Sequence, residues 1–154
     1  MSSSKEGLFE LGTDGPKSIL VGVDGSTTAA RAAWYAAGLA RRQGASMTAV
    51  FVAPIAAGLG VAAGAALEVA QRESAEQSAE EMRRRAADFS REFGLPIAFI
   101  AAHGDPFTEI CRVAEEIRAD AVVVGASAHA GHRLIGSLAV RLVRKARWPV
   151  TVVP

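Results

Sequence analysis

The sequence predicts an α/β fold, a parallel sheet with helices on both of its faces. Short apolar runs of strand length recur along the chain, at 18–23, 47–52, 96–101, 121–124 and 150–153. A stretch with apolar residues three or four positions apart follows each run except the last, as in an amphipathic helix. Strict alternation of strands and helices implies crossover connections, and these make neighbouring strands parallel.

The first strand and helix are predicted from residues 18–44. The unbroken apolar run at 18–23 is typical of a strand that is buried on both faces. Either Ser26 or Thr27 can cap the next helix, whose apolar face runs to about Arg42. Gly44 then ends this helix.

The middle of the chain combines a long connection with a long helix. After the second strand, small residues fill 54–66, and a connection of that length is usually functional or disordered. A charged helix is expected at 67–93, with an apolar stripe made of Ala75, Ala79, Met82, Ala86, Phe89 and Phe93. Such a stripe predicts core packing against the sheet.

The third helix has a sharp start after its strand. Asp105 is the expected N-cap, and Pro106 takes the first helical position, where its missing N–H leaves no bond unmade. Cys111, the one cysteine of the chain, falls on this helix beside Ile110 and Val113, so we expect a buried structural thiol. A single cysteine excludes an internal disulfide and a thiolate metal cluster.

Length and composition indicate one domain. We expect this domain at 17–154, after a flexible N-terminal arm at 1–16 that lacks the pattern of a secretory signal, and we expect a cytoplasmic protein. The formal net charge is +1 and the basic residues are spread over several helices, which argues against a nucleic acid partner. Residues 44–67 carry no charge, but Pro54, several glycines and many alanines argue against a membrane segment.

The segment 121–137 has the layout of an anion site. Gly125 follows a strand and allows the backbone to turn without steric hindrance. Gly136 and Ser137 precede the helix expected at 138–146, and the unpaired N–H groups of a helix start attract negative charge. Ser137 can cap this helix, bond a phosphate, or do both.

Other polar residues at strand ends have competing interpretations. Asp24 either organises the turn at Gly25 or accepts a hydrogen bond from a ligand hydroxyl. His103 either belongs to a ligand site at the end of its strand or simply makes a hydrogen bond to a neighbouring loop. His129 and His132 form a weak zinc signal, because no carboxylate lies nearby in sequence, and a plain exposed loop is favoured over a metal site.

The segment that starts at Gly125 resembles the signature of the universal stress proteins. In that family Gly, two residues, Gly, nine residues and then Gly-Ser or Gly-Thr wrap the phosphates of ATP. Gly125 matches the first glycine, and Gly136 with Ser137 matches the closing pair. Ala128 stands where the second glycine belongs, and the loop is two residues shorter than the signature. The resemblance extends from residue 18 to 154.

The resemblance implies a Rossmann-like, adenine nucleotide alpha hydrolase-like sheet with strand order 3-2-1-4-5 and two helices on each face. It implies ATP or another adenine nucleotide as the ligand, with Mg²⁺ as a candidate companion, and a homodimer through the last strand at 150–153. The expected nucleotide-binding residues are Asp24, Gly25, Ser26, Val52, Gly125, Ala126, Ser127, His132, Arg133, Gly136 and Ser137.

Three functions are compatible with these residues. The leading one is a non-catalytic stress-response protein that binds an adenine nucleotide weakly and regulates an unidentified protein partner. The alternatives are a ligand-free dimeric interaction module and a slow ATP hydrolase that uses Asp24, the loop and a divalent metal. The chain has no GxGxxG after its first strand, no GxxxxGK[ST] and no GxSxG, which argues against dinucleotide, P-loop and nucleophile-elbow enzymes.

Overall fold

The computed structural model describes residues 15–53, 55, 64–126 and 136–154. Along the chain lie β1 (Ser18–Val23), α1 (Thr27–Gln43), β2 (Ser46–Ala53), α2 (Gly64–Phe93), β3 (Ile97–His103), α3 (Pro106–Glu116), β4 (Ala121–Gly125), α4 (Ser137–Lys145) and β5 (Val150–Val153). The strands pair in parallel in the order β3-β2-β1-β4-β5, which confirms the predicted fold and strand order. The predicted arm at 1–16 falls almost entirely outside the described residues and stays a prediction.

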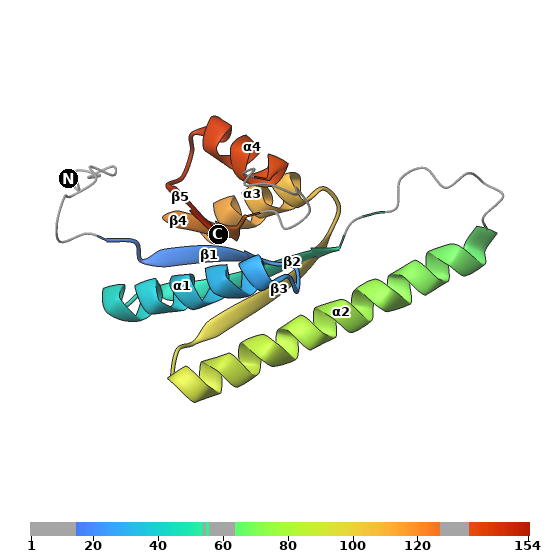
Figure 1. Cartoon of the computed structure of the whole chain (residues 1–154), viewed down its shortest axis with the longest axis horizontal. Coiled ribbons are helices and arrows are strands. Elements are labelled where there is room, and N and C mark those ends of the chain that lie inside the picture. Colours follow the sequence, from blue (N-terminus) through green and yellow to red (C-terminus); the bar gives the residue numbers. More distant parts are fainter. Residues whose placement is uncertain (1–14, 54, 56–63, 127–135) are drawn as a thin grey trace, which may run out of the picture.

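The sheet separates two apolar cores, because alternate residues of each strand point to opposite faces. Ile19 and Val21 of β1 pack on the side of α1, whereas Leu20 packs on the side of α3 and α4. Figure 1 shows the same division, with α1 and α2 on one side of the strands and α3 and α4 on the other. Alanines such as Ala32 and Ala36 are fully buried, so α1 approaches the sheet closely.

Side chains cap α1 and α3 as the sequence suggested. Ser26, rather than Thr27, is the N-cap of α1, and its Oγ accepts a hydrogen bond from the backbone N–H of Ala29 at 3.1 Å. Asp105 caps α3, because its Oδ2 accepts the backbone N–H of Thr108 at 3.0 Å. Both helix starts are therefore determined locally.

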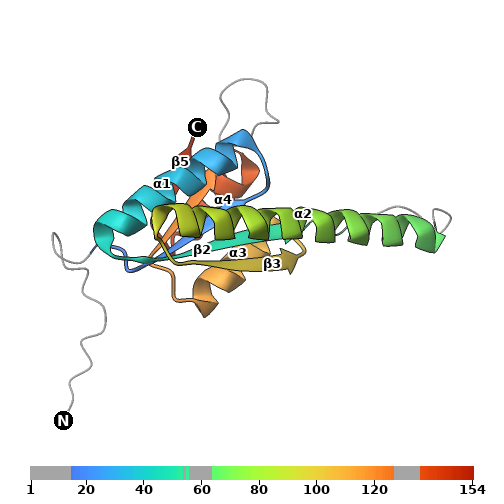
Figure 2. The same ribbon diagram turned by 90° about the horizontal axis from the view of Figure 1, so that it is seen from below.

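The helix α2 is longer and less buried than predicted. It begins at Gly64 instead of Leu67, because the alanines that precede Leu67 are strong helix formers. Its apolar stripe turns toward the sheet but is only half-buried, and no residue of α2 is buried. The reason is visible in Figures 1 and 2: the helix extends well past the sheet, and the stretch from Gly64 to Ala70 is exposed.

The C-terminal half of α2 is attached to α1 by aromatic contacts. The ring of Trp34 lies edge-on to Phe89 and Phe93, at centroid distances of 4.6 and 5.0 Å. Elsewhere α2 is stabilised within itself by exposed ion pairs one turn apart, Glu80–Arg83, Glu81–Arg85 and Asp88–Arg91. The helix is thus anchored at one end.

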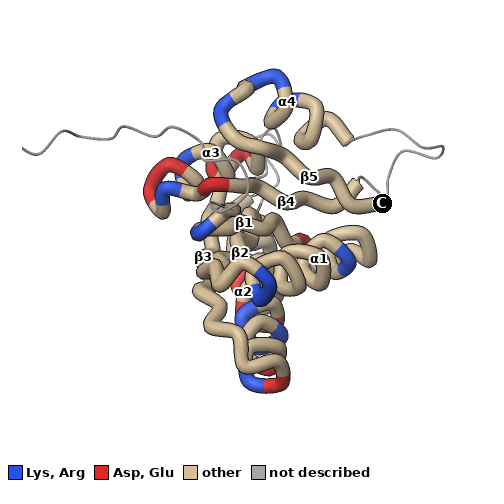
Figure 3. The backbone as a smooth tube through the Cα atoms, turned by 90° about the vertical axis from the view of Figure 1, so that its left-hand side faces the viewer, with Lys and Arg blue, Asp and Glu red and all other residues tan. Residues whose placement is uncertain are grey.

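Charged residues lie mainly on the helices and at strand ends (Figure 3). Arg144 and Lys145 occupy the last turn of α4, where cations suit the helix dipole.

Cys111 is half-buried rather than buried, because it lies beside the buried face of α3, which consists of Ile110, Val113 and Ala114. This partial burial raises the pKa of its thiol. Among the described residues, no helix is both long enough and apolar enough to span a membrane.

Candidate functional site

A cavity of about 210 Å³ opens at the carboxyl ends of β1, β2 and β4. It lies where the strand order reverses: β2 and β3 extend the sheet to one side of β1, and β4 and β5 extend it to the other. This is the position at which open parallel sheets bind their ligands. Valines at the ends of the strands and Ile110 of α3 make up much of its apolar lining.

The N-terminal ends of α1, α3 and α4 all contribute to the cavity lining. Backbone N–H groups at a helix start have no partner within the helix and carry partial positive charge. Side chains cap α1 and α3, but no side chain caps α4 among the described residues. Asp24 is the one charged side chain that lines the described part of the cavity, so the start of α4 is its most favourable place for an anion.

The turn between β1 and α1 is held by the Asp24 side chain. Oδ1 of Asp24 accepts the backbone N–H of Ser26 at 2.9 Å. Gly25 between them has φ +82°, a left-handed conformation that other residues rarely adopt. Asp24 thus organises the turn, and because it is exposed and lines the cavity it can also accept a bond from a ligand. That second role stays a prediction.

The end of β4 is joined to the start of α1. The hydroxyl of Thr28 donates to the carbonyl oxygen of Ala126 at 2.6 Å. Gly125 packs against this helix start so closely that a Cβ there would lie 2.5 Å from the carbonyl carbon of Thr28. The close packing of α1 against β4 therefore explains the glycine at 125. The predicted reason, a turn that only glycine can make, does not apply, because the φ angle of Gly125 is not positive.

The helix α4 begins at Ser137, with Gly136 as its N-cap. Of the two roles considered for Ser137, the structure does not show capping, because the N-cap is Gly136 and Ser137 is the first helical residue. The bond to a phosphate stays a prediction. Gly136, Ser137, Leu138 and Ala139 line the cavity. The first turn of α4 therefore borders the cavity, and its backbone N–H groups have no partner within the helix.

A second hollow of about 330 Å³ adjoins the cavity at Asp24 and Val52, which line both. Its far wall is α2, which contributes Ser78, Glu81, Met82 and Arg85. The two hollows form an elongated site, with the start of α4 at one end and α2 at the other.

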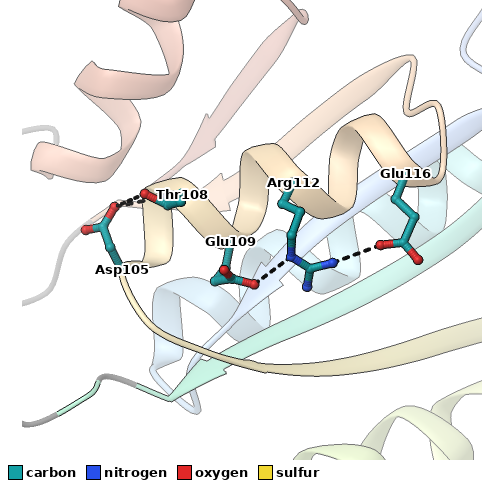
Figure 4. A network of polar contacts seen from close by, with 5 residues as sticks. All are labelled: Asp105, Thr108, Glu109, Arg112 and Glu116. Atoms are coloured by element: carbon teal, nitrogen blue, oxygen red, sulfur yellow. Dashed lines mark hydrogen bonds and ion pairs between the residues drawn. The ribbon is translucent and has the colours of Figure 1, made fainter.

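An ion pair fixes α3 against α4 next to the cavity. Nη1 and Nη2 of Arg141 donate to the two carboxylate oxygens of Asp105, each at 3.1 Å, and the guanidinium carbon lies 4.2 Å from the Phe107 ring centroid. The bonds from Arg141 and then from Thr108 lower the pKa of Asp105 to about 2. Figure 4 shows the Asp105–Thr108 contact and, farther along α3, Arg112 paired with Glu109 and Glu116.

The structure brings most of the described predicted residues together. Those that line the cavity are Asp24, Ser26, Val52, Gly125, Ala126, Gly136 and Ser137. Gly25 lines the adjoining hollow. Ser127, His132 and Arg133 lie outside the described residues, as do Ala128 and His129. His103 lines a different hollow beneath α2, so it does not join the site.

Sequence reasoning missed several lining residues. Thr28, Ile110 and Leu138 lie within helices whose patterns indicated only packing. One sequence feature could have identified Thr28. It places a hydroxyl group in the first turn of the helix that follows the candidate site residue Asp24.

Among the residues that the structure describes, no three His, Cys, Asp or Glu side chains are grouped so as to hold a metal ion.

Known proteins share this sequence pattern and architecture. The model of the universal stress protein family matches residues 16–154. A universal stress protein of Methanocaldococcus jannaschii is 30% identical over 139 residues, which cover 89% of this chain and 81% of that protein. The structure of universal stress protein UspA from Lactobacillus plantarum superposes with a TM-score of 0.78 at 27% identity, covering 90% of this chain and 97% of that one.

Two more distant solved structures contain nucleotides. A universal stress protein in complex with cAMP has a TM-score of 0.69 at 23% identity and covers 90% of this chain and 97% of its own. The universal stress protein from Archaeoglobus fulgidus in complex with dAMP has a TM-score of 0.62 at 24% identity. The match covers 88% of this chain and 96% of that one. At these identities the likeness concerns the fold alone. The family match over 16–154, together with the relative at 30% identity, shows that the chain belongs to the universal stress protein family.

Proposed function

We propose that this chain is a cytoplasmic, non-catalytic regulatory protein that binds an adenine nucleotide at the carboxyl ends of β1, β2 and β4. The single observation that carries the proposal is the polarity of the site, with Asp24 on one wall and the uncapped start of α4 on another. Family members crystallised with cAMP and dAMP support the ligand class.

This polarity determines how the nucleotide lies. The phosphates bind at Gly136 and Ser137, where backbone N–H groups and the helix dipole favour negative charge. Asp24 would repel phosphates, so it accepts a hydrogen bond from a ribose hydroxyl instead. The base then occupies the adjoining hollow between Val52 and Met82.

Binding is weak in this proposal. Ala128 replaces a glycine and the loop is two residues short, which reduces backbone contact with phosphates, while His132 and Arg133 supply compensating donors. We expect a dissociation constant of tens of micromolar or poorer, equivalent to a binding free energy of about 6 kcal/mol at most.

Isothermal titration calorimetry with ATP, ADP and AMP tests the proposal. Asp24→Ala and Gly136→Val should each weaken binding, the first by removing the hydroxyl acceptor and the second by blocking the approach of phosphate to the backbone. Asp88→Ala is the matched control, because Asp88 is an exposed carboxylate paired with Arg91 on α2. No heat at millimolar ligand would instead favour the ligand-free interaction module.

Hydrolysis is the remaining alternative. Incubation with ATP and Mg²⁺ separates it from simple binding, because a binding protein returns its ATP intact. Turnover that is lost in Asp24→Ala would overturn the non-catalytic assignment, whereas turnover that persists in that variant would point to a contaminating enzyme.

A further inference from the structure

A further hollow lies beside the nucleotide site, between α1, α2 and the sheet. It measures about 180 Å³, and its walls include Ala33, Trp34, Met47, Ala49, Met82 and Phe89. It shares Val23, Ser26 and Ala29 with the nucleotide cavity. It shares Gly25, Met82 and Arg85 with the adjoining hollow. Trp34 is 55% exposed, so a small molecule can reach the hollow from solvent.

The hollow exists because facing positions carry the smallest apolar side chain. Ala33 of α1, Ala49 of β2 and Ala86 of α2 all border it, and α2 stays half-buried along this face. An enclosed apolar cavity of about 150 Å³ binds benzene, so the volume of this open hollow is sufficient for one aromatic ring.

The surrounding groups favour an aromatic ligand over an aliphatic one. Trp34 and Phe89 already meet edge to face at 4.6 Å, and a further ring can extend this arrangement. Met47 and Met82 add two thioethers to the lining, and sulfur makes favourable contacts with ring edges.

One charged side chain, Arg85, borders the hollow among the described residues. Arg85 pairs with Glu81 one turn earlier on α2, and their side chains are 62% and 46% exposed. Exposed pairs of this kind contribute little, so a ligand carboxylate can replace Glu81 and take a bidentate bond from the guanidinium. We propose that this hollow binds a small aromatic carboxylate, with its ring among Trp34, Phe89 and Met82 and its carboxylate on Arg85.

The test uses Trp34 as the reporter. The chain has two tryptophans, so Trp148→Phe leaves Trp34 as the one that emits. Titration with benzoate should change its fluorescence in a saturable way, with half-saturation in the millimolar range. Benzylamine has the same ring and the opposite charge, and should bind at least about tenfold more weakly because it meets Arg85.

Two pairs of variants in the Trp148→Phe background locate the binding. Ala86→Leu fills the hollow and should abolish the benzoate signal, whereas Ala87→Leu, on the exposed side of α2, should keep it. Arg85→Gln should weaken benzoate binding, whereas Arg84→Gln should not. Circular dichroism melting verifies that each variant is folded.

Three results would overturn the proposal. The first is the absence of a saturable change with benzoate, or an equal change in Ala86→Leu and Ala87→Leu. The second is equally tight binding of benzylamine. The third is Trp34 emission that depends on protein concentration, because the hollow would then be covered by a second copy of the chain. Trp34 and Ala86 line neither part of the nucleotide site. Ala86→Leu should therefore abolish the benzoate signal and leave ATP binding unchanged, which keeps the two proposals distinguishable.

Discussion

Gly125 shows how a single absent side chain shapes the site. A Cβ at this position would lie 2.5 Å from the backbone of Thr28 and 2.6 Å from the amide nitrogen of Ala29. We expect Gly125→Ala to reduce the free energy of unfolding by about 1–3 kcal/mol, because α1 must move away from β4. Since α1 carries the Asp24 turn at its start, nucleotide binding should weaken as well.

A matched control is available on β1. A Cβ at Gly22 would have its nearest neighbours at 3.5 Å, an ordinary contact, although Gly22 lines the same cavity. Gly22→Ala should therefore leave the urea unfolding midpoint nearly unchanged. Equal effects of the two substitutions would show that the close approach of α1 to β4 is not what requires glycine at 125.

Asp105 should make stability depend on pH at acid values. Its pKa is lowered from 3.8 to about 2 by Arg141 and Thr108. A carboxylate with a lowered folded-state pKa contributes stability that is complete above its unfolded pKa and is lost as the pH falls through the folded value. The melting temperature of Asp105→Asn should be lower than that of the parent protein at pH 7.

The difference in melting temperature between Asp105→Asn and the parent protein should shrink below pH 4 and vanish near pH 2. Thermal unfolding followed by circular dichroism measures it. Arg141→Gln should show a partial convergence, since it removes the principal cause of the lowered pKa but also the contact with Phe107, which does not depend on pH in this range. A difference that stays constant down to pH 2 would mean that the charge of Asp105 does not stabilise the fold.

Among the elements, β5 has a free backbone edge through which copies of the chain can associate. It lies at an edge of the sheet, with half-buried side chains and no charge. The backbone N–H groups of Val122 and Ala126 donate to the carbonyl oxygens of Pro149 and Val153. Because parallel pairing alternates along a strand, the backbone groups of Val152 point outward, where a second β5 can pair with them.

We therefore expect a homodimer through β5, and Val152→Pro should convert it to a monomer. Proline removes the outward N–H without breaking a bond between β4 and β5. Val152→Thr keeps this N–H and the branched side chain, so it should remain dimeric. Light scattering at micromolar concentration distinguishes these states, and a parent protein that is monomeric there would contradict the expectation, as would a dimer that survives Val152→Pro.

At the scale of the whole molecule, nucleotide binding should stabilise the fold. The cavity is built from β1, β2, β4 and the starts of α1, α3 and α4, so a ligand there contacts both halves of the sheet. Ligand at one hundred times its dissociation constant adds about 2.7 kcal/mol. For a chain of this length the melting temperature should rise by roughly 5–10 °C, measured by scanning calorimetry with millimolar ATP.

The variants show whether that rise comes from the proposed site. Gly136→Val should lose it, and Asp88→Ala should retain it. A rise of equal size in the parent protein and in Gly136→Val would place the nucleotide elsewhere on the molecule.

The order of the elements and two helix caps could be predicted from the sequence, because these features depend on residues close together in the chain. Buried runs such as 18–23 identify strands, and the oxygens of Ser26 and Asp105 reach N–H groups three residues ahead. Asp24 and Gly136 could be placed at one end of the sheet for a similar reason, since parallel strands deliver their carboxyl ends to the same edge.

The tertiary structure alone decided the features that depend on contacts between distant segments. The close approach of Thr28 to Gly125 joins residues almost a hundred positions apart, and no local pattern reports it. The half-buried stripe of α2 has the same origin, because helical spacing shows which face is apolar and only packing decides how far that face is covered. The sequence by itself thus determined that strand-end residues such as Asp24 and Gly125 meet at the carboxyl edge. The packing of helices on the sheet decided which helix residues join them and what shape the hollows have.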